Sequence, residues 1–188
     1  MIPVGFVNSP YMVYKIVLYG NEILRKQCEL VDEGADVRKL TDDMFETMYN
    51  AKGVGLAAPQ VGLNMRLFVA DLSSCKNDYG IEKLVTINPI LEFPSDIEVV
   101  LESEGCLSIP DMYAYVPRKK AVIVKYHDVN WNYHEEKFSD MAARIIQHEA
   151  DHLYGKMYID HIIRTKSIEK HLDDIAKKKV TAKYEITY

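Results

Sequence analysis

The chain has 188 residues, 48% of them hydrophobic and 27% charged, which is typical of one globular domain with an apolar core. Its formal net charge of −5, with no basic block before residues 177–179, argues against nucleic acid as the main partner, and no apolar run is long enough to span a bilayer. The three cysteines, Cys28, Cys75 and Cys106, are too few for a disulfide framework and indicate a reducing compartment, so we expect a cytoplasmic protein.

Up to residue 138, the sequence predicts one helix and several short strands. Residues 1–14 form a leader whose order the sequence does not decide, and residues 15–188 form a single domain. A β-branched run predicts a strand over residues 15–19, followed by a helical turn at residues 22–26. Apolar residues at helical spacing predict a helix over residues 36–50. Further strands are predicted over residues 66–71, 84–88, 97–102, 121–129 and 133–138.

Residues 53–60 (GVGLAAPQ) have almost no side-chain bulk. Such a stretch lets another backbone approach closely, although an ordinary turn explains the composition equally well. A phosphate-binding loop is less well supported, because no Lys-Ser or Lys-Thr pair follows. Gln60 is the one side chain of the segment that both donates and accepts hydrogen bonds.

The pattern His148-Glu149-Ala150-Asp151-His152 lies in a predicted helix over residues 139–155, with a capping serine at its start and Gly155 at its end. Residues four apart share one face of a helix, so both imidazoles can reach one metal ion, and Glu149 lies close enough to handle a proton of bound water. This H-E-x-x-H arrangement favours a hydrolytic metal site over two buried core histidines.

A catalytic site of this type needs a third protein ligand and one open position for water. His161 and Glu169 are downstream candidates, and Cys106 is an upstream one. The spacing alone does not choose among them.

The last part of the chain predicts a helix over residues 166–177 and a half-buried strand over residues 180–188. The predicted fold is therefore a single α+β domain, with antiparallel or mixed sheets around the central H-E-x-x-H helix and a C-terminal strand.

Three segments in this order resemble the peptide deformylase family: residues 53–60, residues 104–108 (EGCLS) and residues 147–152 (QHEADH). The similarity extends to residues 42–49 and 108–110 and covers roughly residues 15–160. It implies a metal-dependent hydrolase that removes the formyl group from the N-terminal methionine of new polypeptides and releases formate. It further implies a monomer working near the ribosome exit, binding an N-formylmethionyl peptide and neither membrane nor nucleic acid.

The resemblance also implies site residues. Cys106, His148 and His152 would hold one divalent metal, Fe²⁺ as the native ion with Zn²⁺ or Ni²⁺ also accepted. Hydroxide from the metal-bound water would attack the formyl carbon, with Glu149 as the general acid and base. The side chain of Gln60 and the backbone N–H of Leu107 would bind the formyl oxygen.

Four further residues are expected to bind the substrate. The thin backbone at Val54 and Gly55 suits pairing with an extended peptide, and Ile145 is placed to line an apolar slot for methionine. Gly105 is expected to contact the substrate as well.

Among the neighbouring residues, Glu104 and Arg118 resemble a family pair that steadies the cysteine loop. The chain departs from the family at Tyr113, where many members carry arginine, and at Arg144, where many carry an aliphatic residue near the methionine slot. These two departures concern side-chain preference and peptide affinity rather than metal chemistry.

Two other functions compete with this one. A metallopeptidase cutting internal bonds would need a third ligand downstream of the helix and a long open cleft. A non-catalytic relative that only binds metal or peptide is disfavoured, because Glu149, Gln60 and the three expected ligands are all present.

Overall fold

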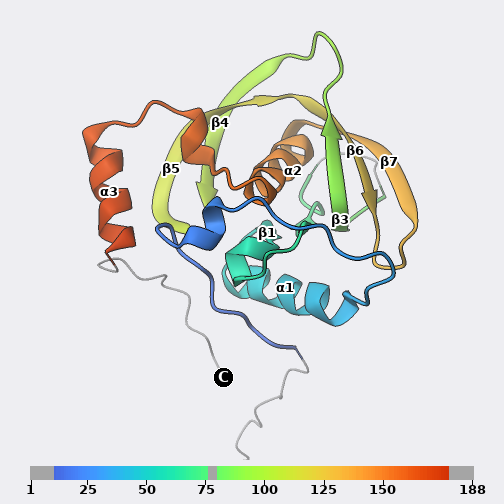
Figure 1. The fold of residues 1–188 in the computed structure, drawn as a ribbon. Helices are drawn as coiled ribbons and strands as arrows, with labels where there is room; N and C mark the ends of the chain where they lie inside the picture. Colours follow the sequence, from blue (N-terminus) through green and yellow to red (C-terminus); the bar gives the residue numbers. More distant parts are fainter. Residues whose placement is uncertain (1–10, 76–79, 178–188) are drawn as a thin grey trace, which may run out of the picture.

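The computed structural model describes residues 11–75 and 80–177. At its centre is the helix α2 (Asp140–Leu153), which contacts strands of both sheets and lies between them in Figure 1. From Ala142 onward nearly every residue of α2 is buried. Its polar side chains must therefore find partners inside the protein, because an unpaired buried polar group is costly.

The larger sheet has five strands, and each neighbouring pair is antiparallel. Its order is β1 (Gly55–Ala57), β2 (Leu67–Asp71), β3 (Lys83–Glu92), β6 (Ala121–His127) and β7 (Tyr133–Ser139). Val122, Val124 and Tyr126 alternate along β6 and pack with Phe138 of β7 in the same core cluster as Ile146 of α2. Because β1 is the edge strand, one of its sides is open to pairing.

The smaller sheet is an antiparallel hairpin of β4 (Val99–Cys106) and β5 (Ile109–Lys119). Cys106 pairs with Ile109, so a two-residue turn joins the strands. Side chains alternate across a strand, which turns Glu104 and Arg118 into the protein and leaves Tyr113 exposed.

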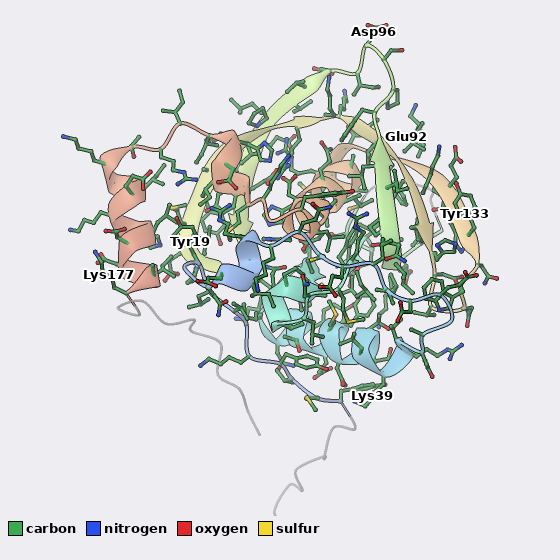
Figure 2. All side chains as sticks on the ribbon, viewed as in Figure 1. Tyr19, Lys39, Glu92, Asp96, Tyr133 and Lys177 are labelled. Carbon is green, nitrogen blue, oxygen red and sulfur yellow. The ribbon has the colours of Figure 1, made fainter. Side chains whose placement is uncertain are left out.

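Two further helices pack around these sheets. The helix α1 (Arg38–Asn50) buries Met44 and Met48 in a cluster with Leu56, and α3 (Lys166–Ala176) buries Leu172. Short 3-10 helices are η1 (Glu22–Arg25), η2 (Ala58–Val61) and η3 (Tyr158–His161). Figure 2 shows the charged side chains of Lys39, Glu92 and Lys177 at the outside of the molecule. None of the helices in the described part of the chain has the length and apolar character that a membrane span needs.

Within the described residues, the predicted α-helices and strands agree with the structure, to within a few residues at their ends, except at three places. The strand predicted over residues 15–19 is wrong: this segment forms no ladder and is held by single bonds such as Val17 N to Gln60 O at 2.8 Å. The short strand β1 and the long strand β5 were missed. The strand predicted over residues 180–188 and the first ten residues of the leader lie outside the described residues.

Candidate metal centre

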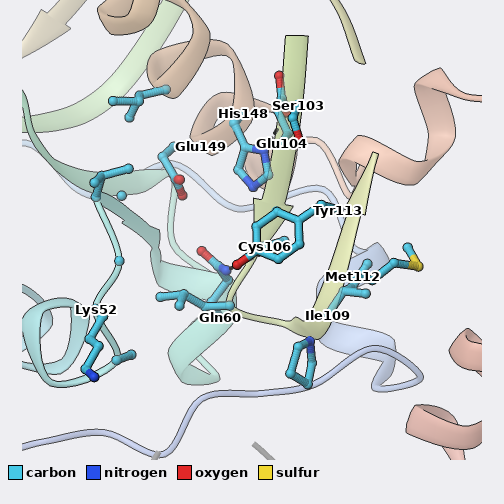
Figure 3. Close-up of a pocket in the computed structure, with 18 of the residues that line it drawn as sticks. Lys52, Gln60, Ser103, Glu104, Cys106, Ile109, Met112, Tyr113, His148 and Glu149 are labelled. Carbon is cyan, nitrogen blue, oxygen red and sulfur yellow. Dashed lines mark hydrogen bonds and ion pairs between the residues drawn. The ribbon is translucent and has the colours of Figure 1, made fainter. Parts of the chain in front are cut away.

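Three metal-binding side chains from two elements meet in the interior. Cys106 ends β4, while His148 and His152 stand one turn apart on α2. Their ligand atoms lie within 4.8 Å of one another, and Cys106 Sγ is 3.4 Å from His152 Nε2. Within residues 11–75 and 80–177, no other group of three such side chains comes together in this way. Figure 3 shows His148 and Cys106 facing the same cleft.

The chemistry of these donors fits a divalent transition metal. Burial would raise the pKa of the Cys106 thiol, but the neighbouring His152 and His148 outweigh that effect and lower the pKa to about 5. The thiolate is the form that binds metal, and a thiolate with two imidazoles is an established ligand set for a catalytic ion with one open position.

The orientation of His148 is fixed by Glu104. His148 Nδ1 lies 2.9 Å from Glu104 Oε2. Burial raises the pKa of this carboxyl, but hydrogen bonds from His148 and Arg118 outweigh it and lower the pKa to about 2, so the carboxylate accepts and the ring donates. His148 Nε2 is thereby left free to bind a metal ion, which is the orientation that a carboxylate partner gives to histidine in known metal sites.

The expected pair of Glu104 and Arg118 is present. Arg118 Nε and Nη2 donate to the two carboxylate oxygens at 2.9 and 3.0 Å. Arg118 Nη1 also donates to Asp151 Oδ2 at 2.5 Å, so one guanidinium links the hairpin to α2. The Glu104 side chain is 5% exposed, which makes this a buried ion pair rather than a surface one.

Glu149 points into the same space without joining the donor group. Its Oε2 is buried and has no hydrogen-bond partner among the described residues. Burial raises its pKa to about 7. An orphaned carboxylate oxygen beside three metal donors fits a site that also holds water. Glycine at position 55 permits this placement, since a Cβ there would lie 2.7 Å from Glu149 Cδ.

Gln60 reaches the centre from η2. Its Oε1 accepts a hydrogen bond from Ala57 N at 2.8 Å, which turns Nε2 toward Cys106 Sγ at 3.5 Å and Ser108 Oγ at 3.2 Å. Ser108 is fully buried and was not singled out from the sequence, although it belongs to the matching residues 108–110. Leu107 lies in the turn after Cys106, and its side chain packs where a Cβ on Gly53 would lie.

An open cleft of about 840 Å³ adjoins these residues. Of the site residues expected from the sequence, all but His152 line it; they are Val54, Gly55, Gln60, Gly105, Cys106, Leu107, Ile145, His148 and Glu149. His152 is 1% exposed. The cleft therefore has the volume of a ligand-binding site, and two of the three donor side chains, Cys106 and His148, are part of its lining.

The two downstream ligand candidates are not in the donor group. His161 Nε2 lies 2.7 Å from Asp151 Oδ2, and the Glu169 side chain is 54% exposed on α3. The metallopeptidase alternative, which needed one of them as a ligand, loses its support from the sequence.

The two departures from the family pattern have different surroundings. Tyr113 is 77% exposed at the mouth of the cleft, and its ring covers Gly105, where a Cβ would lie 2.6 Å from Cε1. Arg144 also lines the cleft, but its side chain is buried, and its guanidinium donates to carboxylates and carbonyls of the hairpin.

The amino-acid sequence is similar to known proteins along most of its length. A family model described as polypeptide deformylase matches residues 13–168. A peptide deformylase from Cytophaga hutchinsonii is 42% identical over 181 residues, covering 94% of this chain and 98% of the relative. One from Karelsulcia muelleri is 41% identical over 157 residues, covering 82% of this chain and 81% of that protein.

Solved structures give the same result. The peptide deformylase from Thermus thermophilus is 35% identical with a TM-score of 0.80, covering 89% of this chain and 99% of that one. The enzyme from Thermotoga maritima is 37% identical with a TM-score of 0.74, covering 82% and 100%. The similarity thus runs along most of the chain and is not confined to three motifs.

Proposed function

Because the chain belongs to the peptide deformylase family, which confirms the resemblance seen in its motifs, we propose that it removes the N-formyl group from the N-terminal methionine of newly made polypeptides and releases formate. The observation that carries this proposal is the meeting of Cys106, His148 and His152 at the base of a cleft, with Glu149 beside them. A donor group with a neighbouring general base, open to a peptide-sized cleft, suits hydrolysis of an amide.

In this proposal Cys106, His148 and His152 hold one divalent metal ion, with Fe²⁺ as the native ion and Zn²⁺ or Ni²⁺ as substitutes. The support is the thiol with its lowered pKa and the two imidazoles within 4.8 Å. When bound, such an ion makes water more acidic and polarises a carbonyl oxygen.

Glu149 would move the proton. Its carboxylate accepts a proton from the attacking water and passes it to the nitrogen of methionine as the formyl C–N bond breaks. In the metal-free chain burial raises the pKa of Glu149 to about 7, and a carboxyl group that titrates near neutral pH can both accept and release a proton there. The Glu149 side chain is buried, so the proton that it accepts is not readily lost to bulk water before it reaches the leaving nitrogen.

Gln60 and Leu107 would stabilise the charge that develops on the formyl oxygen. Gln60 Nε2 faces the donor group, and its own oxygen is fixed by Ala57 N, so the amide cannot turn around without losing that bond. Loss of one such donor typically costs about 3–4 kcal/mol of transition-state stabilisation.

The edge strand β1 would bind the peptide backbone. An extended chain can add to the open side of β1 near Val54 and Gly55, with Gly105 across the cleft. Ile145 stands on α2 one turn before Glu149 and would line the methionine slot. That the protein is a monomer, works in the cytoplasm and acts near the ribosome exit stays a prediction.

The test is formate release from formyl-Met-Ala-Ser by the Fe²⁺-loaded chain under anaerobic conditions. We expect one formate per peptide and a free methionine amine. Cleavage of casein without formate release would instead favour a metallopeptidase, and absence of both reactions in a metal-loaded protein would overturn the proposed function.

A further inference from the structure

A second buried arginine, Arg144, contacts the carboxylate that orients His148. It stands on α2 one turn before His148 and is 5% exposed. Its guanidinium donates to two carboxylates and two carbonyls of the β4–β5 hairpin: Glu104 Oε1 at 2.7 Å, Glu102 Oε2 at 3.0 Å, Val116 O at 2.9 Å and Val100 O at 2.8 Å.

Both oxygens of Glu104 are enclosed by donors. Oε1 accepts from Arg118 Nε and Arg144 Nη1, and Oε2 accepts from Arg118 Nη2 and His148 Nδ1. Arg118 belongs to the same hairpin as Glu104 and fixes the plane of the carboxylate. Arg144 approaches from the helix that carries His148, so together with the bond from Arg118 to Asp151 it sets the distance between that plane and the helix.

We propose that Arg144 is a positioning residue for the metal centre: by holding Glu104 against α2, it keeps the His148 ring turned with Nε2 toward Cys106 and His152. This inference rests on the proposed function only in taking these three side chains as metal ligands. A histidine ligand that loses its oriented partner gains rotational freedom, and the cost of such a loss is typically 10–100-fold in metal affinity.

Arg144 could also serve only to hold the hairpin on α2, and the contact with Glu102 separates the two roles. Glu102 Oε2 accepts from Arg144 Nε, but the Glu102 side chain is 49% exposed. Among the described residues it forms no hydrogen bond or ion pair with the three donor side chains. Glu102→Gln weakens one tie of Arg144 to the hairpin while leaving its bond to Glu104 in place. It is the matched control.

The experiment measures Zn²⁺ affinity by chelator competition and records the visible spectrum of the Co²⁺-loaded form, using the full-length chain. We expect Arg144→Met to bind Zn²⁺ about 10–100-fold more weakly and to shift the Co²⁺ bands. Arg144→Lys should recover part of both, because its ammonium can still reach Glu104. Glu102→Gln should match the parent in both.

A double variant shows whether Arg144 acts through Glu104. In a Glu104→Gln background, Arg144→Met should cost little additional Zn²⁺ affinity, because the carboxylate through which it acts is gone. The proposal is overturned if Arg144→Met binds Zn²⁺ and shows Co²⁺ bands like the parent, or if its cost is equal in both backgrounds. Should Arg144→Met fail to fold, Arg144→Gln takes its place, because its shorter, neutral side chain cannot hold Glu104 as the guanidinium does; parent-like Zn²⁺ affinity and Co²⁺ bands in Arg144→Gln would then overturn the proposal. No peptide enters these measurements, so failure of formate release would count against the proposed function alone.

Discussion

The carboxylate of Glu149 rests against the backbone of Gly55, where a Cβ would lie 2.7 Å from Cδ and 2.8 Å from Cγ. Any side chain at position 55 must therefore move the Glu149 carboxylate away from its place beside the donor group. We expect Gly55→Ala to lose about 10²-fold in kcat/KM, because misplacing a reacting group by about 1 Å has a cost of this size. Formate release measures the loss, and metal analysis should show an unchanged metal content.

Gly53→Ala is the control for this variant. A Cβ at residue 53 would meet Leu107 Cδ1 at 2.8 Å, the far end of a side chain that can turn aside. The Gly53→Ala variant should therefore be clearly more active than Gly55→Ala. Equal activity of Gly55→Ala and the parent would mean that the position of Glu149 is unimportant.

Replacing the carboxylate itself separates proton transfer from metal binding. Glu149 lies outside the donor group, so Glu149→Gln should keep the metal while kcat falls by about 10²–10⁴-fold, the usual contribution of general acid–base catalysis. Formate release and metal analysis on the same sample check both statements. A metal-loaded Glu149→Gln with parent activity would remove Glu149 from its role.

The thiolate can be tested through affinity and distance. Cys106→Ser should weaken Zn²⁺ binding by more than the roughly 10–100-fold typical of an outer partner, since a ligand itself is lost. X-ray absorption of the Zn²⁺-loaded parent should show one ligand about 0.2–0.3 Å farther out than the nitrogens, as expected for sulfur. Unchanged affinity in Cys106→Ser would mean that the ligand set is wrong.

The buried Glu104 predicts a dependence of folding stability on pH. Its pKa is about 2 in the folded chain against an ordinary 4.5, because hydrogen bonds from His148 and Arg118 outweigh its burial. As the pH falls, the carboxyl group takes up its proton in the unfolded chain before it does so in the folded chain. The contribution of Glu104 to the free energy of unfolding is therefore complete above about pH 5 and is lost as the pH falls toward 2.

Urea unfolding of the metal-free parent and of Glu104→Gln measures this contribution. The parent should be the more stable near pH 6, by on the order of 3 kcal/mol from this linkage, and the gap should narrow as acid is added. A gap that stays constant down to about pH 3 would contradict the linkage.

The central helix could be predicted from the sequence because its evidence is local. The apolar spacing, the cap and His148-Glu149 lie within residues 139–155, and the helix forms over Asp140–Leu153. The strand β5 was missed for an equally local reason: Pro110 and Pro117 interrupt its pattern. In the structure both prolines lie in a two-stranded sheet, where half of the backbone N–H groups need no partner strand.

The donor group depends on contacts that are distant in sequence. Cys106 is 46 residues before His152, and no spacing rule connects a hairpin turn to a helix that far along the chain. The family resemblance named Cys106, while the pattern of residues alone left it beside His161 and Glu169. The partners of Arg144 could not be predicted at all. Glu102 and Glu104 lie about 40 residues earlier in the chain, and no local pattern around Arg144 indicates which carboxylates it contacts.

The strand β1 offers only three residues, Gly55–Ala57, at the rim of its sheet. If a peptide adds to β1 as proposed, a strand of this length can pair with only its first few residues. We expect the turnover rate to depend little on the sequence that follows these residues. One enzyme could then act on polypeptides with many different N-terminal sequences.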